Sequence, residues 1–104
     1  MTEEYVTRAR AAGASDIHLV AGLTPRCRVD GAIRPLGEEV LTPLQCEELV
    51  QELAGGELAT LRVVGEADLA LTIAGVRCRL NLFQQQGAWS AAIRLLNEHI
   101  PNLE

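Results

Sequence analysis

The most regular pattern of hydrophobic and polar positions lies in Val76–Leu96, where the two alternate along two segments joined at Gln86-Gly87. Such alternation over about four to eight residues is typical of a strand with one buried face. The apolar positions are Val76, Cys78, Leu80 and Leu82 on the first segment and Trp89, Ala91, Ile93 and Leu95 on the second. The pattern therefore predicts a β-hairpin whose apolar face packs against the rest of the domain.

Two arginines face one another on the polar side of this hairpin. If Gln86 and Gly87 form a two-residue turn, Arg79 lies directly opposite Arg94, and directly opposed residues share a face. A like-charge pair there is unfavourable by roughly 0.2–1 kcal/mol unless an anion or a carboxylate lies between the two guanidinium groups. The hairpin therefore predicts an anion beside Arg79 and Arg94.

Alternation also predicts four strands outside the hairpin. Asp30-Gly31 is a strong signal for a tight hairpin turn, and Pro35 marks a strand end or a sheet edge because proline has no amide proton for a central ladder. The expected strands cover Ser15–Ala21, Arg26–Val29, Ala32–Leu36 and Ala67–Ile73. Three strands thus precede the middle of the chain and three follow it.

The clearest helix lies between these two groups of strands. Thr42 is its N-cap, Pro43 suits the first helical position, and Gln45 completes a capping box. Apolar residues then recur at helical spacing until Gly55-Gly56 ends the helix. A short amphipathic helix is expected at the start of the chain, and one or two helical turns over Glu57–Val64.

This order of elements predicts an α+β fold. Tight turns between neighbouring strands favour antiparallel pairing, and the apolar helix faces must cover a sheet. We therefore expect a PAS-like domain over residues 1–96, with a mostly antiparallel six-stranded sheet and helices on one face. The polar, proline-containing text of residues 97–104 is expected to begin a linker.

The composition of the chain narrows the classes of function that it can have. The chain has 104 residues, of which 48% are hydrophobic and 22% charged, as in an ordinary globular domain. A net charge of −5 argues against nucleic acid as a partner, because phosphate backbones bind basic surfaces. No apolar run approaches the roughly 20 residues of a membrane-spanning helix, so no direct membrane span is expected.

Sequence motifs give no support to an enzyme acting alone. Cys27, Cys46 and Cys78 show no metal-ligand spacing, and we interpret them as buried reduced thiols, with no metal site. His18 and His99 lie in no catalytic motif, and there is no Walker A, GxSxG or HExxH sequence. The anion beside the arginines is therefore either internal or supplied by a partner. The outward-facing Asp68 or a glutamate on the sheet is the internal candidate. Spacing alone favours neither reading.

Three segments together resemble a known family. ASDIHLVAGLTPRCRVDGAIRPL (Ala14–Leu36) is similar to the ASDLHL…GxPxxRxDGxxRxL opening of type IV pilus retraction (twitching motility, PilT-like) ATPases. LTPLQCEELV (Leu41–Val50) resembles the helix that follows. EADLALTIAGVRCRLNLFQQQGAWSAAIRLLNEHIPNLE (Glu66–Glu104) resembles the later segment, D-x-S-x-x-x-x-G-x-x-R-F-R-V-N-x-F-x-Q-x-G-x-x-x-x-x-R-x-I-P…P-x-L-E. Departures occur in the hairpin loop, at Trp89 and the Gln84–Gln86 run.

The resemblance implies a role within a larger motor. In this family, of the type II/IV secretion ATPase superfamily, the matching region is the PAS-like N-terminal domain. A linker joins it to a RecA-like domain that carries the Walker motifs and uses ATP and Mg²⁺. The family members are homohexamers in the cytoplasm, peripheral to the inner-membrane pilus machinery and its platform protein. The chain is accordingly expected to bind no cofactor and to hydrolyse no ATP by itself. The short segment before Ser15 favours the retraction branch, and the end at PNLE is where the catalytic domain is expected to follow.

The resemblance also assigns a role to the arginines. It implies that the N-terminal domain of one subunit packs on the catalytic domain of the next and that Arg79 and Arg94 contact the terminal phosphate of the nucleotide there. Arg77 matches a further basic position. Two other readings remain: a free-standing PAS-like sensor or protein-interaction module, which a ligand retained through purification would support, and a purely structural oligomerisation domain.

Overall fold

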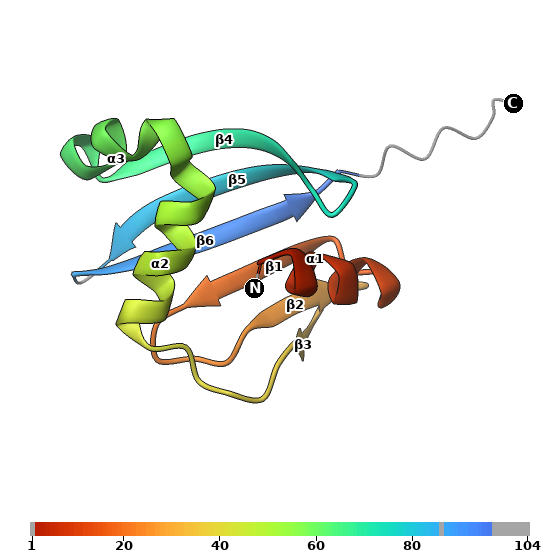
Figure 1. Cartoon of the computed structure of the whole chain (residues 1–104). Coiled ribbons are helices and arrows are strands. Elements are labelled where there is room, and N and C mark those ends of the chain that lie inside the picture. The colour runs from red at the N-terminus through yellow and green to blue at the C-terminus, as the bar shows by residue number, and fades with distance from the viewer. Residues whose placement is uncertain (1, 86, 97–104) are drawn as a thin grey trace, which may run out of the picture.

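A six-stranded antiparallel sheet forms one layer of the structure and helices form the other (Figure 1). The computed structural model describes residues 2–85 and 87–96. The strands are β1 (Asp16–Val20), β2 (Arg26–Val29), β3 (Ala32–Pro35), β4 (Glu66–Ile73), β5 (Val76–Gln85) and β6 (Ala88–Leu95). The predicted α+β fold, with its antiparallel sheet and its helices on one face, is confirmed; the expected strand ends differ from the observed ones by a residue or so.

The helices are α1 (Thr2–Ala11), α2 (Pro43–Ala54), the 3₁₀ turn η1 (Gly55–Glu57) and α3 (Leu58–Val64). The predicted capping box of α2 is confirmed: the Gln45 amide donates to the Thr42 hydroxyl at 3.1 Å, and the Thr42 amide donates to the Gln45 side chain at 2.9 Å. Two backbone donors that the helix itself cannot satisfy are thereby paired. No described helix is long and apolar enough to cross a bilayer.

One hydrophobic core lies between the two layers. Figure 1 shows α2 crossing the sheet on the side where α1 and α3 also lie. The apolar stripes of α1 and α2 meet the alternate, inward positions of the strands there. Core residues that are almost completely buried include Val6, Ile17, Leu19, Val50, Leu61, Cys78, Leu80, Leu82 and Ile93. The opposite face of the sheet carries the polar positions of the same strands.

Two of the tight hairpins have the two-residue loops that their sequences predict. Val29 pairs with Ala32, and Asp30 and Gly31 between them have φ angles of 51° and 82°, a left-handed pair typical of a type I′ turn. In the second hairpin Gln85 pairs with Ala88, which leaves a two-residue loop. The register that follows is the predicted one, because Arg79 is the direct partner of Arg94.

The strand order is β3-β2-β1-β6-β5-β4, so the first and last strands are neighbours at the centre of the sheet. Asp16 of β1 is the direct partner of Arg94 of β6, and His18 is the partner of Ala92. Alternation along the chain placed Asp16 and His18 on a polar face, but it did not predict which strand lies beside them. This long-range pairing brings both residues to the arginine pair.

Candidate anion site on the open face of the sheet

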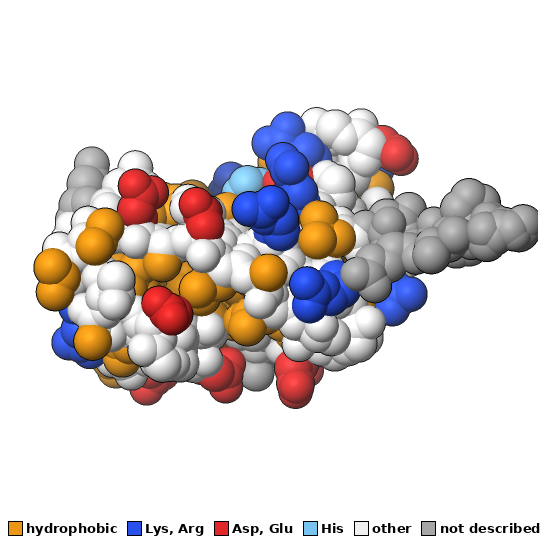
Figure 2. Space-filling model, turned by 90° about the horizontal axis from the view of Figure 1, so that it is seen from above, with side chains coloured by type: hydrophobic (Ala, Val, Ile, Leu, Met, Phe, Trp, Pro, Cys, Tyr) orange, Lys and Arg blue, Asp and Glu red, His pale blue; other side chains and the backbone are white. Residues whose placement is uncertain are grey.

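Charged residues form a row across the four strands at the centre of the open face. Asp16 of β1 is the register partner of Arg28 of β2 on one side and of Arg94 of β6 on the other. Arg94 is in turn the register partner of Arg79 of β5. Directly opposed residues in antiparallel strands have side chains on the same face, about 4.5–5.5 Å apart at Cβ. Figure 2 shows basic side chains gathered next to a histidine at one side of the molecule, with acidic side chains close by.

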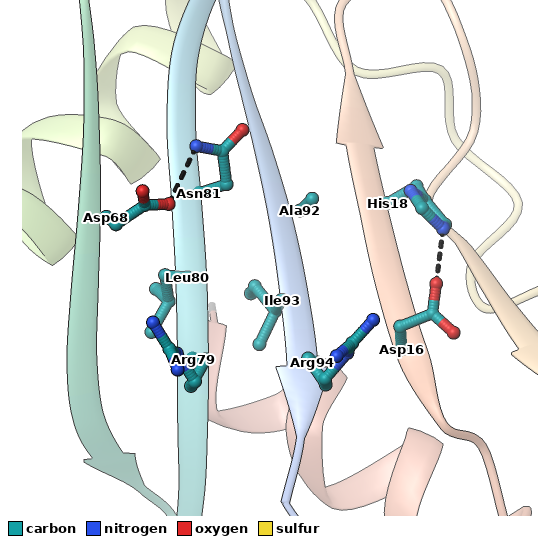
Figure 3. A pocket seen from close by; sticks show the side chains of 9 residues that line it. All are labelled: Asp16, His18, Asp68, Arg79, Leu80, Asn81, Ala92, Ile93 and Arg94. Carbon is teal, nitrogen blue, oxygen red and sulfur yellow. Dashed lines mark hydrogen bonds and ion pairs between the residues drawn. The ribbon is translucent and has the colours of Figure 1, made fainter.

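A groove of about 310 Å³ lies over this row. Figure 3 shows it from the open side, with the helices behind the strands. Arg79 and Arg94 stand near one end of the groove, and the small Ala92 leaves a recess between Asn81 and His18. Acidic residues lie at both sides, Asp68 on β4 and Asp16 on β1. Arg79 and Arg94 are thus direct register partners, as the predicted turn required, and both line the groove.

Neither arginine has an ion-pair partner within the part of the chain that the structure describes. The salt bridges found among residues 2–85 and 87–96 join Arg8 to Glu4, His18 to Asp16, and Arg28 to Asp16. Arg79 and Arg94 take part in none of these, and both are exposed. In Figure 3 the Arg79 side chain leans toward β4 and the Arg94 side chain toward β1, so two cationic side chains stand on neighbouring strands at one end of the groove. Such a local positive site suits an anion.

Arg77 lies on the same face, two residues before Arg79, and is exposed. Its Cα partner on β4 is Thr72, and its carbonyl accepts a hydrogen bond of 2.9 Å from the Leu96 amide beyond the end of β6. Arg77 is not among the residues that line the groove. The structure therefore separates Arg77 from the pair formed by Arg79 and Arg94.

Asp68 was the internal anion that the sequence suggested for the arginines. In the structure its Oδ1 atom accepts a hydrogen bond of 2.9 Å from the Nδ2 atom of Asn81, its direct partner on β5. No salt bridge to Asp68 is found among the described residues. Asp68 thus lines the groove without neutralising either arginine. The internal pairing with an arginine, which the sequence left open, is not found among the described residues.

Asp16 is the acidic residue that sequence reasoning missed at this site. Its Oδ2 atom lies 2.6 Å from the Nε2 atom of His18, and its Oδ1 atom accepts a hydrogen bond of 2.5 Å from the Ser15 hydroxyl. Nε of Arg28 lies 3.8 Å from the same Oδ1 atom. Burial raises the pKa of Asp16, but the hydrogen bonds from Ser15 and His18 and the charges of His18 and Arg28 outweigh it and hold the pKa below its usual value.

The structure offers no sign of metal or thiol chemistry in the part of the chain that it describes. No group of three or more His, Cys, Asp or Glu side chains is placed to hold a metal ion there. Cys27, Cys46 and Cys78 are free and buried in the core, as the sequence suggested, and burial raises the pKa of each thiol. Such thiols are protonated and poorly reactive at neutral pH. His99 lies outside the described residues.

Taken together, the fold and the site define a PAS-like α+β domain that presents two exposed arginines, direct register partners, on the open face of its sheet. No protein-family model matches the chain. The type IV pilus retraction ATPase PilT of Pseudomonas aeruginosa is 32% identical over 94 residues, covering 88% of this chain and 27% of PilT. The protein YggR of Escherichia coli K12 is 35% identical over 104 residues, 98% of this chain and 31% of YggR.

A solved structure gives the same result. The crystal structure of the pilus retraction motor PilT with bound ADP superposes with a TM-score of 0.85 and 34% sequence identity, over 96% of this chain and 30% of the PilT chain. The chain is therefore a homologue of the N-terminal domain of PilT-like secretion ATPases. It spans less than a third of the length of these relatives.

Proposed function

We propose that this domain is the N-terminal part of a hexameric ATPase that powers type IV pilus retraction. The proposal is supported by the likeness to PilT in both sequence and structure. Residues 1–96 would be the PAS-like domain. Residues 97–104, which lie outside the described part of the chain, would begin the linker to a RecA-like domain. That domain would hold ATP and Mg²⁺, in the cytoplasm beside the inner-membrane platform protein of the pilus.

Within this motor, the open face of the sheet packs on the catalytic domain of the neighbouring subunit. Arg79 and Arg94 then contact the terminal phosphates of the ATP bound there. The observation that carries this assignment is that two exposed arginines are direct register partners on neighbouring strands and lack an ion-pair partner among the described residues. Anionic phosphates from outside the domain would supply the missing charge.

Arginine chemistry suits this role. The guanidinium group stays charged at all physiological pH values and presents a planar set of donors that matches phosphate oxygens. Phosphoryl transfer requires stabilisation of the charge that spreads over the transferring group, and an arginine supplied by a neighbour contributes about 10³–10⁵ in kcat in well-studied cases. Because β-sheet pairing fixes both arginines, they would arrive at the nucleotide already oriented.

The test is ATP turnover by the full-length protein. Arg79→Ala and Arg94→Ala should each lower kcat by about 10²-fold or more, given the magnitude for such arginines, while size-exclusion chromatography still shows the assembled oligomer. Arg62→Ala is the matched control, because Arg62 is an exposed arginine on α3, away from the groove. Unchanged turnover in both open-face variants would rule out the phosphate role.

Arg77→Ala makes a useful companion variant. Arg77 shares the face with Arg79 but does not line the groove, so its removal should lower turnover less than removal of either groove arginine. The alternative of a free-standing sensor module gains no support, since the relatives that match the chain are ATPases where their names state an activity.

A further inference from the structure

Arg94 has a carboxylate directly across from it and yet does not bind it. Asp16 and Arg94 are register partners on β1 and β6, on the same face. Opposite charges in this position attract by about 0.2–1 kcal/mol, so an ion pair is the expected outcome. No such pair lies within salt-bridge distance in the described part of the chain.

The bonds that Asp16 makes explain this absence. Both carboxylate oxygens are engaged on the side away from β6: Oδ2 by His18 at 2.6 Å, and Oδ1 by the Ser15 hydroxyl and by Nε of Arg28 at 3.8 Å. Figure 3 shows the Asp16 carboxylate meeting the His18 ring on β1 while the Arg94 side chain lies on the neighbouring strand. Three partners, Ser15 just before β1, His18 on β1 and Arg28 on β2, thus compete with one guanidinium group on β6.

We propose that His18 and Arg28 are positioning residues that hold the Asp16 carboxylate away from Arg94, so that Arg94 stays open to a phosphate-type anion. Without them, Asp16 turns to Arg94 and neutralises half of the arginine pair. The part of this proposal that concerns phosphate rests on the proposed function. The part that concerns Asp16 and Arg94 does not.

The exposure of the three side chains is consistent with the positioning of Asp16 by His18 and Arg28. The side chain of Asp16 is 22% exposed, against 36% for His18 and 45% for Arg28. The carboxylate is therefore shielded enough for its hydrogen bonds to matter, since exposed ion pairs contribute little. It also lines the groove, directly across from Arg94 on the neighbouring strand.

The experiment reads the Asp16–Arg94 contact directly in this 104-residue chain. The Nε–Hε signal of Arg94 is followed by ¹⁵N NMR in the wild type, in His18→Ala/Arg28→Ala and in the triple variant that adds Asp16→Asn. The double variant should shift the Arg94 signal and slow its exchange with water, as expected for a new charge-assisted hydrogen bond. Adding Asp16→Asn should return the signal to its wild-type position.

Inorganic tripolyphosphate is the probe for the anion. The double variant should bind it about 3- to 10-fold more weakly than the wild type, because Asp16 then competes for Arg94, and adding Asp16→Asn should restore the affinity. A purely structural role for His18 and Arg28 predicts no such rescue. Arg26→Ala is the matched control, because Arg26 is the β2 partner of His18 but forms no salt bridge with Asp16 among those found in the described residues.

The outcomes are distinct. An unchanged Arg94 signal in the folded double variant overturns the proposal, and so does a shift that Asp16→Asn does not reverse. If the double variant does not fold, Arg28→Ala alone gives the same readings, with a smaller expected shift. A reversible shift of the Arg94 signal with no tripolyphosphate binding in any variant supports the positioning role and counts against the proposed function.

Discussion

The two faces of the sheet are built from the same strands, but they differ in burial and in charge. On β5, Leu80 points to the helices and is 1% exposed, while its neighbour Arg79 points to the open side. The helix side is closed by apolar contacts that any well-packed domain needs. The open side keeps two like charges together, at a cost in stability. That arrangement does not favour the stability of the domain, and the proposed function accounts for it by giving the open face an anionic partner.

The largest expected difference between the faces is in the free energy of unfolding. Leu80→Ala should lower it by about 2–5 kcal/mol, because a fully buried side chain is lost and a cavity remains. Arg79→Ala, one residue away on the same strand, should change it by less than about 1 kcal/mol. Urea denaturation of the 104-residue chain measures both. Similar losses in the two variants would contradict the division into a stabilising and a functional face.

A smaller change in the free energy of unfolding should show whether the contact between Arg79 and Arg94 is unfavourable. Arg94→Ala relieves the like-charge contact with Arg79 and should raise the free energy of unfolding by roughly 0.2–1 kcal/mol at low salt. The gain should shrink at about 1 M NaCl, where screening is strong. Arg62→Ala, on α3, serves as the control and should show no comparable gain. A clear loss of stability in Arg94→Ala would mean that Arg94 has a stabilising partner inside the domain.

The contribution of Asp16 to the stability of the domain should depend on pH. The pKa of Asp16 is lowered in the folded chain, so its interactions stabilise the fold above its unfolded pKa of about 3.9, and this contribution is lost as the pH falls through the folded value. The stability difference between the wild type and Asp16→Asn should therefore be present at neutral pH and vanish in strong acid. Urea denaturation at a series of pH values measures it. A difference that grows on acidification would contradict the pairing described for Asp16.

The sequence was sufficient for local features of this structure. Alternation and turn chemistry determined the strands, the Thr42 capping box and the register that places Arg79 opposite Arg94, because each depends on residues close together in the chain. The neighbour of β1 was not predictable in this way. Pairing of β1 with β6 joins residues that are 70 to 78 positions apart in the chain. Only that pairing explains why Asp16 and His18 belong to the site.

The hydrogen bond of Asp68 shows that side-chain pairing, too, was not predictable from the sequence. Its position on the polar face made Asp68 a reasonable partner for an arginine, but its cross-strand partner is Asn81, whose amide donates a hydrogen bond of 2.9 Å to one of its oxygens. Conversely, the carboxylate that does lie opposite Arg94 is that of Asp16, and it is bound by His18 of the same strand and by Arg28 of β2. Which of several nearby charges pair depends on register and rotamer together, and the sequence determines the first more clearly than the second.

The central claim is that the open face completes a phosphate site in a neighbouring subunit. Mixing two defective full-length variants tests it most directly. One variant carries Arg79→Ala and Arg94→Ala with an intact nucleotide site, and the other has intact arginines with a disabled Walker A motif. Each should be nearly inactive in ATP turnover alone, and co-assembled oligomers should regain activity, because arginines of the second reach nucleotide bound to the first. No gain on mixing, in oligomers shown to contain both subunits, would contradict the claim.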